Sequence, residues 1–360
     1  MWRALVLLLI FTQPLAAFST SQPDVEVVPM IRGLDEPWGL GFLPDGSVLV
    51  TERDGRLLHA KNGEVNVIKG LPRIAVQGQG GLLDVMVPRD FAQSSEVFFS
   101  FSKKQGRGAG TALAVAEFDA NQGRLRNVRV IFELAQGSTG GRHFGSRIVE
   151  ARDGSLFLTI GDRGDRPSAQ DLSVQNGSVV RVNRDGTVPA SNPFVDQSEA
   201  QPHIWSYGHR NPQGAALDNA GNLWVVEHGA KGGDEVNRIT KGANFGWPVI
   251  SYGEHYSGAK IGEGTAKAGM QQPEFYWDPS IAPSGMMIYS GALWPEWKGS
   301  MFVGSLKFDY ISRLDPRSSR EVEQIKSDAT QRVRDVVEAP DGSIWFLSVG
   351  QGAAYRVTPK

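Results

Sequence analysis

The sequence holds a histidine and an aspartate, His143 and Asp162, that could act together as a general base and its orienting carboxylate. His143 lies in the glycine-rich stretch GGRHFG, and Asp162 closely follows the apolar segment LFLTI. A strand, a tight Asp-Gly turn and a second strand between them would bring the two side chains close together. A histidine held by a carboxylate is a common general-base arrangement. For His143 alone, a hydrogen-bonded structural histidine is an equally good interpretation.

Cationic and amide side chains stand beside several other apolar segments. Arginines and lysines that converge near neutral amides suit an anionic small molecule with more than one carboxylate or phosphate. Each arginine taken alone is better explained as a solvated loop charge or a salt bridge, so the prediction depends on their recurrence at equivalent positions. His209 is interpreted as structural. The residues that we expect to converge with His143 are Gln79, Arg210, Asn211, Arg332 and Arg334, with Lys307 within reach of them.

The segment from Val225 to Pro248 is a candidate metal site. It combines turn glycines, which can direct main-chain carbonyls to one point, with the adjacent acids Asp234 and Glu235. Calcium prefers carboxylate and carbonyl oxygens. The spacing is not that of an EF-hand, and from spacing alone a capped turn between strands is the better interpretation. Zinc is a poorer candidate still, because the chain has no Cys and no paired-His spacing.

The elements that must position these residues are short strands. An apolar strand, a turn with Gly or Asp-Gly and a second apolar strand recur six times, and no long helical period competes. Six such units with about four strands each predict an all-β fold, a six-bladed β-propeller with four-stranded antiparallel blades. The 43 glycines agree with many turns. The copies begin at Gly39, Leu82, Ser146, Gly214, Met286 and Val333, and the second lacks the Gly of the turn.

In a propeller the first strand of each blade lines the central channel. Residues that enter each copy would therefore gather at one channel mouth, which is why the cations and amides named above are expected to converge. A two-domain β-sandwich is the alternative fold, and it is disfavoured because no linker divides the copies. The longest irregular region, Ser251 to Pro279, is interpreted as a loop excursion.

The N-terminus has the form of a secretory signal peptide. Arg3 precedes an apolar run that is too short to span a bilayer, and Pro14 and small residues follow it. We expect a signal peptide over residues 1–20, cleaved between Ala17 and Ser19, and one propeller domain over residues 21–360. Export to the periplasm or the medium follows, with no membrane span in the mature chain. The net charge of −2 gives no indication of a nucleic-acid partner.

The motifs in combination resemble a known family. PWGLGF, GQGGLLDV, GGRHFGSR, TIGDRGD, YGHRNPQG, GGDEVN, NFGWP, SLK and RVRD occur in that order between about Leu34 and Val357. They are similar to those of the soluble pyrroloquinoline quinone (PQQ)-dependent aldose sugar dehydrogenases, the glucose/sorbosone dehydrogenase family. The resemblance implies a six-bladed propeller with PQQ at one channel mouth, calcium, an aldose oxidised at C1 to the lactone, and an electron acceptor of unknown identity.

The resemblance also implies roles for single residues. His143 matches the general base and Asp162 its orienting carboxylate, while Gln79, Arg210, Asn211, Lys307, Arg332 and Arg334 match cofactor contacts. Tyr256 stands where some members place a further cofactor contact. The carbonyls of Gly229 and Ala230 match those that hold calcium against the quinone, and Glu235 with the Phe245 carbonyl matches a second, structural calcium site. The short loop from Ser257 to Gly269 is more like that of the compact, broad-specificity members.

Two other functions fit a propeller of this kind. A calcium-dependent lactonase would bring acids and Asn to the channel and need no cluster of cations. A non-catalytic sugar-binding propeller would need no pair such as His143 and Asp162.

Overall fold

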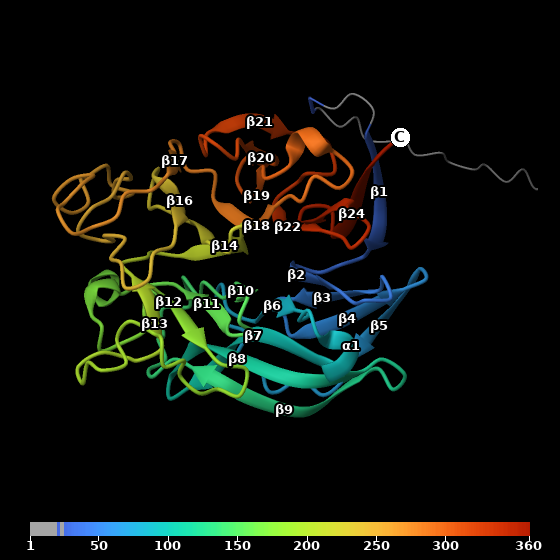
Figure 1. Cartoon of the computed structure of the whole chain (residues 1–360), viewed down its shortest axis with the longest axis horizontal. Helices are drawn as coiled ribbons and strands as arrows, with labels where there is room; N and C mark the ends of the chain where they lie inside the picture. The colour runs from blue at the N-terminus through green and yellow to red at the C-terminus, as the bar shows by residue number, and fades with distance from the viewer. Residues whose placement is uncertain (1–19, 22–24) are drawn as a thin grey trace, which may run out of the picture.

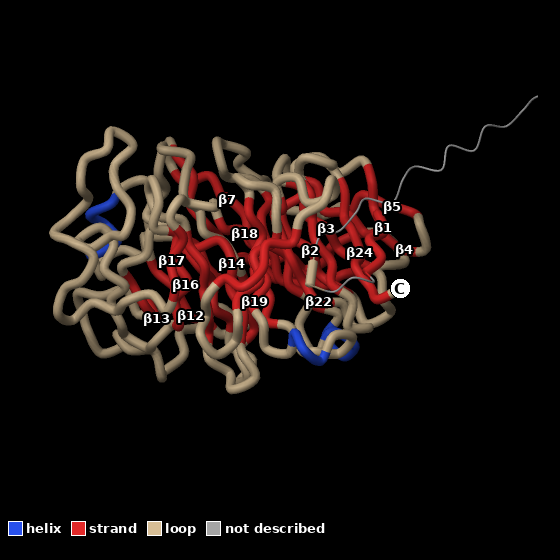
Figure 2. Tube along the Cα trace, turned by 90° about the horizontal axis from the view of Figure 1, so that it is seen from above, coloured by secondary structure: helices blue, strands red, loops and turns tan. Residues whose placement is uncertain are grey.

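The computed structural model describes residues 20–21 and 25–360, and it forms a six-bladed β-propeller. Figure 1 shows the six sheets set around a common centre, with the chain passing round the ring from blue to red. Seen at right angles, the strands run through the middle of the molecule and the loops gather at its faces (Figure 2). Each sheet has four antiparallel strands. The predicted fold is confirmed, and the two-domain sandwich is wrong.

The first three blades follow the chain in order. Blade 1 has β2 (Pro37–Phe42), β3 (Val48–Glu52), β4 (Arg56–Lys61) and β5 (Glu64–Ile68). Blade 2 has β6 (Leu82–Met86), β7 (Glu96–Gln105), β8 (Gly108–Asp119) and β9 (Arg124–Glu133), with the short helix α1 (Phe91–Ser94) before β7. Blade 3 has β10 (Ile148–Glu150), β11 (Leu156–Ile160), β12 (Ser178–Val182) and β13 (Ile204–Tyr207), with the 3-10 helix η1 (Arg166–Gln170) after β11.

The next two blades continue this order. Blade 4 has β14 (Pro212–Leu217), β15 (Leu223–Glu227), β16 (Asp234–Arg238) and β17 (Phe275–Trp277). Blade 5 has β18 (Pro283–Ile288), β19 (Met301–Ser305), β20 (Ile311–Leu314) and β21 (Glu321–Ile325), with the 3-10 helix η2 (Pro295–Trp297) before β19. Strand β17 lies inside the segment Ser251 to Pro279, so that segment is not wholly a loop. All six predicted strand pairs are the first two strands of a blade.

The sixth blade joins the two ends of the described chain. It has β22 (Val333–Glu338), β23 (Ile344–Ser348) and β24 (Ala353–Pro359) from the C-terminal side and β1 (Val25–Arg32) as its outer strand. Val25 pairs with Pro359 and Arg32 with Ala353. Every hydrogen bond of this pairing spans almost the whole described chain, so it closes the ring.

Asp-Gly turns form the hairpins that start several blades. In the first, Asp45 Oδ1 accepts hydrogen bonds from the main-chain N–H of Ser47 at 3.0 Å and from its hydroxyl at 2.6 Å. Asp153 with Ser155 repeats this pattern. Gly46 and Gly154 have φ of 80° and 84°, which side-chain-bearing residues rarely adopt. The local sequence therefore sets each turn, as the repeat predicted.

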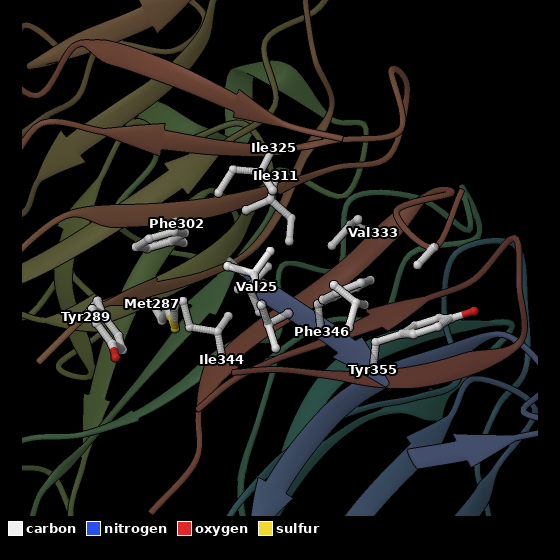
Figure 3. Packing of buried hydrophobic residues seen from close by; sticks show 14 of the residues in the cluster. Val25, Met287, Tyr289, Phe302, Ile311, Ile325, Val333, Ile344, Phe346 and Tyr355 are labelled. Atoms are coloured by element: carbon white, nitrogen blue, oxygen red, sulfur yellow. The ribbon is translucent and has the colours of Figure 1, made fainter. Parts of the chain in front are cut away.

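Apolar side chains fill the spaces between neighbouring blades. Figure 3 shows the contact between blades 5 and 6, where Phe302 of β19 and Phe346 of β23 are fully buried. Val25 of β1 and Tyr355 of β24 pack into the same cluster. Each such side chain stabilises the fold by about 1.5–3 kcal/mol on burial. The closing strand is thus held by packing as well as by its ladder.

A buried ion triad crosses the centre of the ring. Arg147, just before β10, places Nη1 2.7 Å from Asp84 Oδ1 and Nη2 3.1 Å from Asp335 Oδ1. Burial raises the pKa of Asp84 to about 7, against the lowering effect of Arg147. Arg147 also lies 4.6 Å from the ring centroid of Trp38. The triad links β6, the residue that precedes β10, and β22, and so ties the neighbouring blades 2 and 3 to blade 6.

The predicted signal peptide lies outside the described residues, except for Thr20. Within the residues that the structure describes, no helix is long and apolar enough to cross a membrane.

Candidate active site

His143 and Asp162 are in direct contact. Nδ1 of His143 lies 2.6 Å from Asp162 Oδ1. The Asp162 carboxylate also accepts the Gly164 N–H at 2.7 Å and the Trp247 indole N–H at 2.8 Å, and it is fully buried. With Nδ1–H donated to the carboxylate, Nε2 is the nitrogen that can accept a proton. The contact agrees with the spacing argument, while the catalytic role stays a prediction.

The backbone around His143 is held in an unusual conformation. His143 has φ of 54°, and its N–H donates to Gln79 Oε1 at 2.7 Å. A Cβ on Gly161 would lie 2.2 Å from the His143 carbonyl oxygen, so only glycine fits there. Left-handed backbone at a non-glycine residue costs energy and persists where surrounding contacts fix it. Gln79 and Gly161 therefore set the direction of the imidazole.

The electrostatic surroundings keep His143 neutral to lower pH than a free histidine. Burial lowers its pKa from 6.5, and the positive charges of Arg210 and Arg142 act in the same direction, against the raising effect of Asp162. A base works only while unprotonated, so activity is lost as pH falls through this lowered pKa. We expect the acid limb of the pH profile of kcat/KM to lie below pH 6.5. An acid limb above this value would contradict the assignment of His143.

A cavity of about 470 Å³ lies beside the GGRHFG turn, among the residues that enter or begin the innermost strands. Five predicted cofactor contacts line it: Gln79, Asn211, Lys307, Arg332 and Arg334. Residues that the sequence analysis missed also line it, among them Glu36, Trp38, Arg53, Gln213 and His228. Trp38 lies in PWGLGF and His228 follows a buried strand, but nothing in their local pattern distinguishes them from core residues.

Three cations of the cavity, Lys307, Arg332 and Arg334, form no ion pair with an acid among the described residues, whereas Arg53 pairs with Glu36. Burial, together with the positive charges of Arg332 and Arg147, lowers the pKa of Arg334 to about 9. Nε of Arg210 is buried without a hydrogen-bond partner among the described residues. Buried guanidinium groups in such surroundings are stabilised by an anion. A ligand with several carboxylates fits this set of donors.

Arg210 and Tyr256 lie apart from the cavity's main lining. Arg210 stacks over Trp247 at 5.4 Å and donates from Nη1 to the His228 carbonyl at 3.2 Å. It borders a smaller pocket with Gly229, Glu235 and Phe245. Tyr256 is 74% exposed and lines neither pocket. His228, whose carbonyl accepts from Arg210, lines both pockets, while a cofactor contact by Tyr256 would need a ligand that extends beyond them.

The smaller pocket is rich in oxygen ligands. The side-chain amide nitrogen of Asn237 donates to Glu227 at 3.0 Å and to Glu235 at 3.1 Å. The side-chain oxygen of Asn237, Oδ1, is buried without a hydrogen-bond partner among the described residues. Burial and the charge of Glu227 raise the pKa of Glu235 to about 8. A hard cation would stabilise both carboxylates in their charged form. In the described ranges no three acidic or histidine side chains cluster as ligands, so main-chain carbonyls would have to complete the shell.

His209 is structural, as interpreted from the sequence. It is fully buried, bonds Glu227 through Nδ1 at 2.7 Å and Ser206 through Nε2 at 3.0 Å, and stacks on Phe245. Ala230 is also buried, in a small apolar cluster with Trp247. Only the main-chain oxygen of Ala230 could therefore coordinate a cation.

Comparison with known proteins identifies the family. The glucose/sorbosone dehydrogenase family model matches residues 34–356. The chain is 41% identical to the aldose sugar dehydrogenase YliI of Escherichia coli, over 97% of this chain and 98% of that protein. It is 28% identical to quinoprotein glucose dehydrogenase B of Acinetobacter calcoaceticus, over 88% and 84%.

A solved structure agrees with this match. The crystal structure of the soluble aldose sugar dehydrogenase from Escherichia coli, in its apo form, superposes with a TM-score of 0.88 at 38% identity, covering 93% of this chain and all of that one. The chain belongs to the glucose/sorbosone dehydrogenase family.

Proposed function

We propose that this chain is a quinoprotein that oxidises aldose sugars at C1 to the lactone, with PQQ and calcium as cofactors and His143 as general base. The observation that carries the proposal is the His143–Asp162 pair beside a cavity in which three cations, Lys307, Arg332 and Arg334, form no ion pair among the described residues. The names of the relatives as an aldose sugar dehydrogenase and a quinoprotein glucose dehydrogenase support the choice of substrate and cofactor.

The residues of the cavity suit PQQ, which is a tricarboxylate. Lys307, Arg332 and Arg334 would bind its carboxylates, since guanidinium groups match them in pairs of hydrogen bonds. The contacts with PQQ would be completed by Gln79, Asn211 and Arg210. Tyr256 would cover the side of the quinone that faces solvent. The carbonyls of Gly229 and Ala230 would hold calcium against the quinone. Glu235 and the Phe245 carbonyl would hold a second calcium in the smaller pocket.

In the proposed reaction the chain's own residues handle the proton. When bound, PQQ with its calcium ion accepts the hydride from C1 of the sugar. Nε2 of His143 takes the proton of the C1 hydroxyl, so that the C1–O bond becomes the carbonyl of the lactone. Asp162 holds the imidazole tautomer and stabilises the imidazolium that results. Continued turnover requires an electron acceptor.

The apo protein is expected to be inactive until both cofactors are added. Oxidation of glucose with an artificial acceptor, measured after adding PQQ alone, Ca²⁺ alone and both together, should proceed only in the last case. The absorbance of the bound quinone should change when an aldose is added. Turnover by protein freed of metal and quinone would contradict the proposal.

The same experiment separates the two alternatives. A calcium-dependent lactonase would hydrolyse lactones without the quinone, and the unneutralised cavity cations argue against it. A non-catalytic sugar-binding propeller would leave the quinone absorbance unchanged on addition of sugar. Export remains a further proposal, supported by the form of the N-terminal sequence.

A further inference from the structure

Two arginines beside the base have no role in the site as described so far. Arg142 precedes His143, and its side chain lies over Gly164, where an added Cβ would meet Arg142 Cδ at 3.0 Å. Arg166 begins η1, and its Nη1 lies 2.9 Å from His255 Nδ1. Neither arginine lines the cofactor cavity or the smaller pocket.

Both arginines are close to the His143–Asp162 pair. The charge of Arg142 acts directly on the pKa of His143. Arg166 lies 5.4 Å from the ring centroid of Trp247, and the indole N–H of Trp247 donates to Asp162 Oδ2 at 2.8 Å. Trp247 therefore contacts both the guanidinium of Arg166 and the carboxylate that orients the base.

The positive charge of these arginines is not balanced locally. Among residues 20–21 and 25–360, neither Arg142 nor Arg166 forms an ion pair with a carboxylate. The Asp162 carboxylate, the nearest acid to the base, already accepts bonds from His143, Gly164 and Trp247. The whole chain carries a net charge of −2, so the excess of cations is a property of this site and not of the protein.

The proposed cofactor does not account for the excess. Its three carboxylates would be met by Lys307, Arg332 and Arg334, with Arg210 as a fourth cation. Arg142 and Arg166 remain, beside the base and the tryptophan that contacts its orienting carboxylate and outside the lining of both pockets. A neutral aldose gives two unpaired arginines no partner, whereas an anion forms charge-assisted hydrogen bonds with them.

We infer that the preferred substrates are aldoses with an anionic group, a carboxylate or a phosphate, remote from C1. Arg142 and Arg166 bind the anion while the C1 hydroxyl faces Nε2 of His143. This inference rests on the proposed function and narrows its substrate class to sugar acids or sugar phosphates.

The test compares three substrates on the holoenzyme loaded with PQQ and Ca²⁺. The kcat/KM values for D-glucose, D-glucuronate and D-glucose 6-phosphate are measured with an uncharged quinone as acceptor. One of the anionic sugars should exceed glucose by about tenfold or more, the size expected of hydrogen bonds to charged groups. Which anion is favoured distinguishes a carboxylate from a phosphate site. The ratio of kcat/KM for the anionic sugar to that for glucose should fall as the NaCl concentration is raised.

Variants assign the preference to the two arginines. Arg142→Gln and Arg166→Gln should each bring the ratio of kcat/KM for the anionic sugar to that for glucose toward one. Arg152→Gln, at an exposed position, should leave the ratio unchanged. As a second measurement, calorimetric titration of the loaded His143→Gln protein should show tighter binding of the anionic sugar than of glucose, without turnover.

The possible failures are distinct. If no sugar is oxidised and the quinone absorbance never changes, the proposed function is wrong. If glucose is oxidised as well as or better than both anionic sugars, the dehydrogenase stands and the inference is overturned. If a preference exists but survives both arginine substitutions, the assignment to Arg142 and Arg166 is overturned.

Discussion

Replacing His143 with glutamine is expected to lower kcat by about two to four orders of magnitude, the contribution of a positioned general base. Glutamine keeps a polar side chain of similar reach but cannot take a proton from the C1 hydroxyl. The proposed contacts with the cofactor's carboxylates come from Lys307, Arg332 and Arg334, which the substitution leaves in place. Quinone binding, followed by absorbance, should therefore be retained while turnover is lost.

A matched control separates a catalytic loss from a structural one. His203 lies in a surface groove with Lys103 and Glu133, away from the cavity, and His203→Gln should keep kcat. An unchanged kcat in the His143→Gln protein would remove His143 from the role of base. Loss of quinone binding in that protein would instead show that His143 holds the cofactor site together.

Replacing Arg147 with methionine is expected to cost about 3–5 kcal/mol of the free energy of unfolding, because it leaves buried carboxylates without their cation. Asp84 and Asp335 are both fully buried and face the guanidinium from different blades. The loss is a large part of the 5–15 kcal/mol by which proteins of ordinary stability resist unfolding. Urea denaturation followed by tryptophan fluorescence measures it.

The loss of unfolding free energy in the Arg147→Met protein should change with pH in a defined direction. Burial raises the pKa of Asp84 and Asp335 above the unfolded value of 3.8, and Arg147 opposes that rise. The folded state binds protons on these carboxylates more tightly than the unfolded state even with Arg147 present, and more tightly still without it, so the deficit should grow as pH rises above about 7. Arg317→Met, at a side chain that is 90% exposed, should have little effect. Equal losses in the two variants would show that the triad contributes nothing particular.

The blades could be predicted because their signals are local. A strand, an Asp-Gly turn and a second strand, as in β2–β3 and β10–β11, are specified by neighbouring residues. The pairing of β1 with β24 was not predicted, because a strand's sequence does not say which distant strand it joins. The same holds for β17, whose three residues carry too little alternation to stand out from the loop around them.

The candidate site was predictable to the extent that it stands at repeated positions. His143, Gln79 and Arg334 precede or begin innermost strands, so the fold gathers them, and the family motifs supplied their expected roles. The Asp84–Arg147–Asp335 triad was missed, since single charges within apolar strands do not reveal their partners. Arg142 and Arg166 received no role from the sequence for another reason. Among the described residues they form no ion pair with a carboxylate, and only coordinates show that.

The pairing of β1 with β24 sets when the propeller can close during synthesis of the chain. Val25 and Pro359 are paired, so the strand made first must wait for the strand made last before the ring can close. The five blades between them can form as the chain emerges, but the final contacts cannot. Until β24 has left the ribosome, β1 lacks the strand with which it pairs and the ring stays open, which would suit passage of the unfolded chain through a translocation channel in the proposed export.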